Sequence, residues 1–186
     1  MNQTGSALST SRLCDCSVEE LADWCRHVGQ PPYRARQVFH WVFRKRVVEP
    51  GRMDDLPKSF RRALSERFCV LSSRVIRHLQ SQDGTEKLLV ELDDRRTVEC
   101  VLMREGNRRT ACISTQVGCG MGCVFCASGL KGLERNLTRG EILEQLLHLQ
   151  RLLPPGERLS NVVIMGMGEP LANLDELIPA LERIVD

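Results

Sequence analysis

Three cysteines, Cys119, Cys123 and Cys126, lie close together with the spacing C-x3-C-x2-C. Three thiolates at such short spacing can bind three irons of a cubane iron–sulfur cluster and leave the fourth iron open. An open iron can bind and reduce a small molecule, whereas a fully ligated cluster mainly transfers electrons. The spacing therefore predicts a cluster that takes part in chemistry.

Two other kinds of site use similar cysteine spacings, namely a zinc knuckle and a closed iron–sulfur site. An aromatic residue, Phe125, directly precedes the third cysteine. It favours the open cluster that reductively cleaves S-adenosylmethionine (SAM), the chemistry of the radical SAM proteins. A short motif remains a hypothesis until its structural context is known.

The number of cysteines and the hydropathy of the chain indicate the cellular compartment of the protein. The 186 residues include nine cysteines, an odd number that excludes a complete set of internal disulfides. The segment Met1–Ser11 lacks the apolar stretch of a signal peptide, and no apolar run is as long as a membrane span. These features predict a cytoplasmic protein without a membrane partner, whose thiols serve metal binding or catalysis.

Positive charge is concentrated in one part of the chain. Between Tyr33 and Gln80, twelve Lys and Arg face four Asp and Glu, a local net charge of 12 − 4 = +8. The whole chain carries +2, so the remainder carries 2 − 8 = −6. A basic segment on a nearly neutral protein indicates a polyanion partner such as RNA or DNA, although a solvated helical face would look the same.

The elements that must position these residues change in type along the chain. Residues 1–16 are predicted to be a disordered tail, and residues 17–69 a helical domain that begins at the capping box Ser17–Glu20. The aromatic residues of this domain recur at helical spacing and are predicted to form its core. Residues 70–107 are predicted to be a β-hairpin or meander linker, with a turn at Asp83-Gly84.

From residue 108 onward the pattern alternates between strands and helices. Thr138–Glu141 is a second capping box, Asn161–Met165 is a short apolar strand, and Gly166–Pro170 is a glycine-rich turn after it. This alternation predicts parallel β-α-β construction, in which ligands lie at the carboxyl ends of the strands. Residues 108–186 supply two such units, which predicts the first part of a larger barrel.

An ordered set of motifs extends over most of the chain. Besides the cysteine loop, it comprises Tyr33-Arg-Ala-Arg36-Gln-Val, Leu56-Pro-Lys-Ser, Cys112-Ile-Ser-Thr-Gln-Val-Gly-Cys119, Arg135-Asn-Leu-Thr-Arg-Gly-Glu141 and Asn161-Val-Val-Ile-Met-Gly-Met-Gly-Glu-Pro170-Leu. Together they resemble the RlmN/Cfr family of radical SAM RNA methyltransferases, and the RlmN type most closely. The resemblance implies an α/β fold: a small helical N-terminal domain that contacts RNA, a short antiparallel β segment, and the first two β-α units of an incomplete radical SAM (β/α) barrel.

The resemblance also implies the cofactors and the reaction. The family adds a methyl group to C2 of adenosine in 23S rRNA and tRNA, and draws electrons from a donor such as flavodoxin or ferredoxin. By resemblance, Cys119, Cys123 and Cys126 bind a [4Fe–4S] cluster, and Gly168 and Glu169 contact SAM.

Two further residues match catalytic positions of the family. Glu99 corresponds to the proton acceptor, thirteen residues before Cys112. Cys112 corresponds to the cysteine that resolves the RNA–protein adduct by forming a disulfide. Without the resemblance, Glu99 is a surface glutamate on a strand, and Cys112 is a buried strand thiol or a fourth cluster ligand.

The chain departs from the family pattern in one respect. The family carries the methyl group on a second catalytic cysteine in a C-terminal half, and no cysteine follows Cys126 here. We therefore expect the chain to need a missing C-terminal half for catalysis. The alternatives are a non-catalytic RNA-binding remnant and a zinc-binding RNA module.

Overall fold

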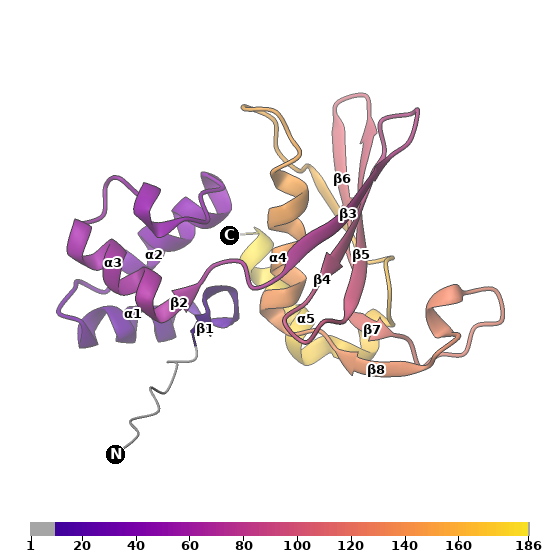
Figure 1. Cartoon of the computed structure of the whole chain (residues 1–186), viewed down its shortest axis with the longest axis horizontal. Coiled ribbons are helices and arrows are strands. Elements are labelled where there is room, and N and C mark those ends of the chain that lie inside the picture. The colour runs from indigo at the N-terminus through magenta and orange to yellow at the C-terminus, as the bar shows by residue number, and fades with distance from the viewer. Residues whose placement is uncertain (1–9, 186) are drawn as a thin grey trace, which may run out of the picture. The chain divides into compact units, whose positions relative to one another are not determined.

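The computed structural model describes residues 10–185, which form two compact units that divide between Leu71 and Ser72 (Figure 1). The first unit is helical, and the second combines helices with strands. The chain thus has the predicted α/β character. Within the described residues, no helix is long and apolar enough to cross a membrane.

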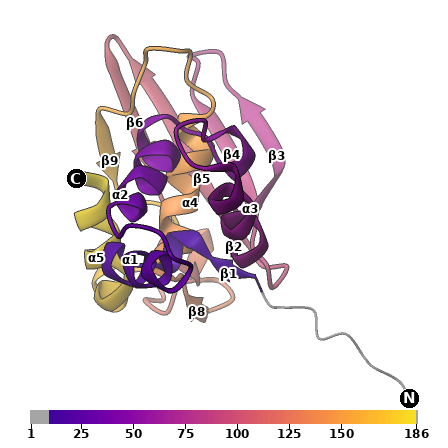
Figure 2. The same ribbon diagram turned by 90° about the vertical axis from the view of Figure 1, so that its left-hand side faces the viewer.

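Three helices and one short parallel strand pair make up the first unit (Figure 2). They are α1 (Val18–His27), α2 (Arg34–Phe39), α3 (Lys58–Arg67), and the pair of β1 (Ser11–Arg12) with β2 (Phe68–Cys69). The Ser17 hydroxyl accepts a hydrogen bond from the Glu20 N–H, and the Glu20 carboxylate accepts one from the Ser17 N–H, so the predicted capping box is confirmed. A π-helix, His40–Arg44, continues α2.

Aromatic side chains form the core of this unit, as the helical spacing predicts. The Trp24 ring lies 5.6 Å from the Phe60 ring and 4.9 Å from the Phe68 ring, measured between centroids. Phe60 and Phe68 are buried. The Phe60 and Phe68 rings therefore pack inside this unit and are not available to stack on a partner.

Part of the predicted tail, residues 11–15, forms secondary structure. Residues 1–9 lie outside the described part of the chain, but β1 and a 3-10 helix, Leu13–Asp15, occupy positions assigned to the tail. Leu13 and Cys14 are buried, and the Cys14 thiol donates to the Val70 carbonyl oxygen. Two apolar residues in a polar segment are too few to show a period, so the prediction was wrong for residues 11–15.

A five-stranded sheet organises the second unit (Figure 1). Its order is β3 (Arg74–Gln80), β4 (Glu86–Glu91), β5 (Thr97–Glu105), β6 (Arg108–Cys112) and β9 (Asn161–Val163). The first four strands are antiparallel neighbours, and β9 is parallel to β6. The predicted meander and the predicted parallel strand thus belong to one sheet.

Two helices accompany this sheet. Helix α4 (Arg139–Gln150) packs on β5, and α5 (Leu174–Val185) packs on α4. The Thr138 hydroxyl accepts from the Glu141 N–H, which confirms the second capping box. Leu88, Val90, Val98, Cys100 and Leu102 alternate along β4 and β5 and are buried, so they define the core face of the sheet.

Buried polar side chains on α4 hold the beginning of the second unit. The Glu144 carboxylate is fully buried and accepts four hydrogen bonds, from the backbone N–H and the hydroxyl of both Ser72 and Ser73. His148 Nε2 lies 3.0 Å from the Ser73 hydroxyl. Ser72 and Ser73 are thus bound to α4, and β3 begins directly after them, at Arg74.

We expect Glu144→Ala to destabilise the chain by about 3 kcal/mol or more, because four donors near Ser72 and Ser73 lose their acceptor inside the protein. Urea denaturation followed by circular dichroism measures the change. Glu105→Ala is the control, since Glu105 is exposed at the end of β5, and it should change stability by less than about 0.5 kcal/mol. Equal midpoints for the two variants would contradict this account.

Candidate functional site

The three cysteines lie on one loop that joins β7 (Gln116–Gly118) to β8 (Leu133–Asn136), two strands that pair with each other (Figure 1). The Cys119 N–H donates to the Gly132 carbonyl oxygen at 3.1 Å, closing the base of the loop. Gly118 has a φ of 75°, and a Cβ there would lie 2.1 Å from that same oxygen. Glycine is therefore required at the base of the loop.

All three loop cysteines are free thiols, and they differ in exposure. Cys119 is 9% exposed at the base, Cys126 is intermediate and Cys123 is exposed. The Cys126 N–H donates to the Cys123 carbonyl oxygen at 3.1 Å, which makes a turn between them. Hydrogen bonds from the backbone and hydroxyl of Ser128 lower the pKa of Cys126, which favours the thiolate that binds metals.

The donor set fits an iron–sulfur cluster in its chemistry, because it supplies three thiols at the required spacing on one loop. Within residues 10–185, no three His, Cys, Asp or Glu side chains are gathered closely enough to hold a metal ion. The loop also exposes large apolar side chains, those of Met121, Val124, Phe125 and Leu130.

The glycine-rich turn after β9 runs alongside the segment that leads from β6 to β7. The Gly166 N–H donates to the Ile113 carbonyl oxygen at 3.0 Å, and the Thr115 N–H donates to the Met167 carbonyl oxygen at 2.8 Å. A Cβ on Gly166 would lie 2.7 Å from the Ile113 oxygen. A Cβ on Gly168, whose φ is 101°, would lie 2.6 Å from the Cβ of Gln116. Close packing between two chain segments thus already requires both glycines.

Gln116 connects the glycine-rich turn to β8, the strand that follows the cysteine loop. Its side-chain oxygen accepts from the Glu169 N–H at 2.8 Å, and its side-chain nitrogen donates to Asn136 Oδ1 on β8 at 2.8 Å. Gln116 is 1% exposed. The half-buried Glu169 carboxylate accepts from the Leu171 N–H at 3.1 Å and so begins a 3-10 helix, Pro170–Asn173.

Glu99 and Cys112 lie on the same face of the sheet. Val101 on β5 pairs with Cys112 on β6, and Glu99 is two residues from Val101, so all three side chains share the face opposite the core. Lys87 Nζ lies 3.1 Å from Glu99 Oε1, and the Glu99 side chain is 44% exposed. Burial raises the pKa of the Cys112 thiol. The structure therefore places the two residues predicted to be catalytic on one face of the sheet.

Ser114 ties this face to the glycine-rich turn. Its hydroxyl donates to the Glu99 carbonyl oxygen at 2.6 Å and accepts from the Met167 N–H at 2.8 Å. The side chain of Gln145 on α4 accepts from the Ser114 N–H at 2.8 Å and donates to the Ser114 carbonyl oxygen at 3.0 Å. Sequence reasoning assigned no role to Ser114 or Gln116. The one sequence feature that could have indicated a role for them is their position inside the Cys112–Cys119 motif.

Comparison with known proteins adds to this geometry. Residues 11–70 match the family model described as the ribosomal RNA large subunit methyltransferase N-terminal domain. The chain is 52% identical over 172 residues to the probable dual-specificity RNA methyltransferase RlmN of Rhodopirellula baltica, covering 92% of this chain and 46% of that protein. It is 47% identical to the dual-specificity RNA methyltransferase RlmN of Desulfosudis oleivorans, covering 89% and 45% respectively.

A solved structure is also similar. A radical SAM methyltransferase from Sphaerobacter thermophilus matches with a TM-score of 0.84 and 41% sequence identity, over 94% of this chain and 51% of that one. About nine tenths of the chain is therefore similar to RlmN proteins and to a radical SAM methyltransferase. The chain spans about half the length of the curated relatives it matches.

Replacing Gly168 tests whether packing against Gln116 requires this glycine. Gly168→Ala should destabilise the chain by about 3 kcal/mol or more, because the φ of 101° disfavours a side chain and the new Cβ overlaps the Gln116 side chain. Gly156→Ala is matched to it, since Gly156 has a φ of 89° and a Cβ there meets no atom within 4 Å. That control should cost about 1–2 kcal/mol in denaturant unfolding. Equal losses would show that Gln116 yields to the new methyl group.

Proposed function

We propose that this chain is the N-terminal part of a radical SAM RNA methyltransferase that methylates C2 of adenosine in 23S rRNA and tRNA. One observation carries the proposal. Gln116 hydrogen-bonds both to the glycine-rich turn at Glu169 and to Asn136 on β8, the strand that follows the cysteine loop. The turn that we assign to SAM binding is therefore joined to the strand pair from which the cysteine loop extends. The relatives that share this sequence are named dual-specificity RNA methyltransferases.

The loop cysteines Cys119, Cys123 and Cys126 would hold the [4Fe–4S] cluster. When bound, the cluster supplies the electron for reductive cleavage of SAM, after an external donor such as flavodoxin or ferredoxin has reduced it. Gly168 and Glu169 would contact SAM. The Glu169 carboxylate can accept a hydrogen bond from the SAM ammonium group, and a charge-assisted bond of this kind is strong.

Glu99 and Cys112 would act on the RNA. Glu99 is exposed enough to reach an adenine base, and its Oε1 would accept the C2 proton while Lys87 lies beside it. The Cys112 thiol would form the disulfide that releases the RNA from the methyl-carrying cysteine. Cys112 is a free thiol in this structure, and no cysteine follows Cys126 in the sequence.

The second unit would be the first part of a (β/α) barrel. The chain spans about half of its relatives, and β9 is the edge strand of the sheet at which further parallel strands would add. Apolar side chains near this edge are exposed, namely Met165, Leu171, Leu174 and Ile178. A C-terminal half with further β-α units would cover them.

The helical first unit would contact the RNA. The segment Tyr33–Gln80 carries the local charge of +8, and phosphate contacts by Arg and Lys would position the RNA without reading its sequence. The family model that covers residues 11–70 is named for a ribosomal RNA methyltransferase domain. Nine cysteines, an odd number, suit the reducing cytoplasm, where we place the protein.

Anaerobic reconstitution of the chain with iron and sulfide should give a [4Fe–4S] cluster. Changing Cys119, Cys123 or Cys126 to Ala should each abolish it, because one thiolate ligand is lost. Cys112→Ala is the matched control and should retain the cluster. Iron and sulfide analysis with visible absorption measures the result. A chain that takes up zinc but no iron, or that loses its cluster through Cys112→Ala, would refute the ligand assignment.

The chain alone, with cluster, reductant and SAM, should not methylate RNA, because the methyl-carrying cysteine is missing. Addition of the C-terminal half of a close RlmN relative should restore formation of 2-methyladenosine, measured by mass spectrometry of RNA digests. Glu99→Gln in the complemented enzyme should reduce turnover by roughly 100-fold or more, since an acid–base residue contributes about that much. Turnover by the 186-residue chain alone would overturn the division of roles between the two halves.

A further inference from the structure

The cysteine loop lies between β7, which is buried, and β8, most of which is exposed. Arg135 is the one residue of β8 with intermediate burial. The β7–β8 pairing is irregular close to the loop, because the register shifts between Val117 and Gly118. Side-chain contacts therefore add to the backbone pairing that holds β8.

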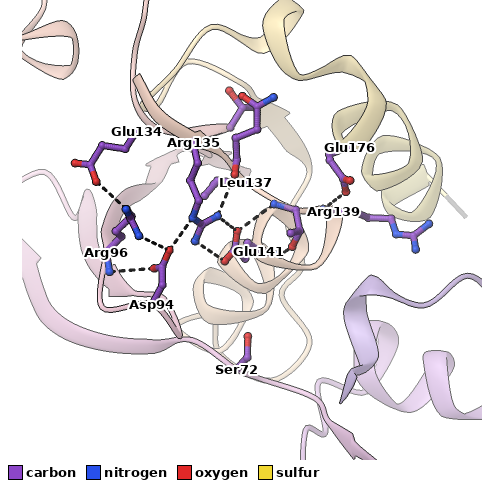
Figure 3. A network of polar contacts seen from close by, with 12 residues as sticks. Ser72, Asp94, Arg96, Glu134, Arg135, Leu137, Arg139, Glu141 and Glu176 are labelled. Atoms are coloured by element: carbon purple, nitrogen blue, oxygen red, sulfur yellow. Dashed lines mark hydrogen bonds and ion pairs between the residues drawn. The ribbon is translucent and has the colours of Figure 1, made fainter. Parts of the chain in front are cut away.

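Arg135 makes the most extensive of these side-chain contacts (Figure 3). Its Nη1 and Nη2 donate to the two carboxylate oxygens of Glu141 at 2.7 and 2.9 Å, and its Nε donates to Asp94 Oδ2 at 2.7 Å. The Arg135 side chain is 28% exposed, and the Glu141 side chain only 1%. Bidentate pairing to a buried carboxylate fixes the direction of a guanidinium and is stronger than a single exposed ion pair.

The two carboxylates are themselves held in place. Glu141 Oε2 also accepts from the Thr138 N–H at 3.0 Å, within the capping box of α4. Asp94 lies in the turn between β4 and β5, where Oδ1 accepts from the Arg96 N–H at 3.1 Å. The hydrogen bond from Arg135 is the largest cause of a strongly lowered Asp94 pKa, so this carboxyl is ionised at neutral pH.

Arg96 adds a second link to the same strand. Its Nε donates to Glu134 Oε2 on β8 at 2.7 Å, and its Nη1 donates to Asp94 Oδ2 at 2.9 Å. Both side chains of this link are 42% exposed, so it is the weaker of the two. Two adjacent residues of β8, Glu134 and Arg135, are thereby joined to the β4–β5 turn and, through Arg135, to the start of α4 (Figure 3).

We propose that Arg135 is the positioning residue of the cysteine loop, clamping β8 between the β4–β5 turn and α4 so that the loop base is fixed before a cluster is bound. The identity of the bound group rests on the proposed function. The clamp itself acts in the chain without a cluster, and it can be tested there. A lysine cannot replace Arg135 fully, because one ammonium group cannot reproduce the bidentate pairing to Glu141 while also reaching Asp94 in the same geometry.

Thiol alkylation in the cluster-free chain tests the clamp directly. Cys119 is 9% exposed at the loop base, so its alkylation reports opening of that base, while the exposed Cys123 gives an internal reference. Arg135→Met should raise the Cys119 rate relative to Cys123 by roughly tenfold, because local opening controls access to buried groups. Arg135→Lys should give an intermediate rate. Mass spectrometry of quenched samples separates the two sites.

Arg109→Met is the matched control. Arg109 is also largely buried, at 18% side-chain exposure, and its Nε lies 2.6 Å from Glu157 Oε2, away from the cysteine loop. It should leave the Cys119 to Cys123 ratio unchanged. An unchanged ratio in Arg135→Met, or equal increases in both variants, would overturn the proposal, because the effect would then be absent or a general loss of stability.

A second measurement follows iron and sulfide per chain after anaerobic reconstitution, with the electron paramagnetic resonance spectrum of the reduced protein. Arg135→Met should bind less iron than the unaltered chain, and Arg109→Met should bind the same amount. If the unaltered chain binds no iron, the proposed function is wrong, but the ratio of Cys119 to Cys123 alkylation still tests the role of Arg135.

If Arg135→Met does not fold, Asp94→Asn is the substitute variant. It keeps the Arg135–Glu141 pair and should show a smaller increase in the alkylation ratio. No increase in Asp94→Asn would then overturn the proposal.

Discussion

The second unit depends on the requirement that buried polar groups on α4 find partners. Glu141, Glu144, Gln145 and His148 are all buried on this helix. A buried carboxylate or amide without a hydrogen bond is costly, so each of these side chains fixes the segment that satisfies it. Glu141 holds β8 through Arg135, Gln145 holds Ser114, and Glu144 and His148 hold the start of the unit. One helix thus sets the relative positions of segments that are distant in sequence.

The segment from Ile113 to Gln116 is held in place on two sides. It is held by Gln145 on one side and packs against the glycine-rich turn on the other. Gly166 and Gly168 come so close to it that a side chain at either position would overlap its atoms. The glycine spacing is therefore first a packing requirement, and the same packing lets the Glu169 N–H donate to Gln116, which also donates to Asn136 on β8.

Local signals in the sequence were reliable where neighbouring residues decide the structure. The capping boxes at Ser17 and Thr138 begin helices as predicted, because cap and partner lie three residues apart. The turn at Asp83-Gly84 is also present, with Gly84 at a φ of 81°. The β1–β2 pair was not predicted. Each strand has only two residues, and the two strands are separated in sequence by nearly the whole helical unit. So short a strand has no period to detect.

The sequence by itself determined the donor chemistry of the cysteine loop, the two capping boxes, and the similarity to RlmN proteins. These properties depend on residue types and on spacings of a few positions. Only the tertiary structure decided that Glu99 and Cys112 share a face, that Gln116 meets Glu169 across 53 positions, and that Arg135 meets Asp94 across 41. Strand register and the satisfaction of buried polar groups select these partners. Both operate between segments whose proximity no local pattern encodes.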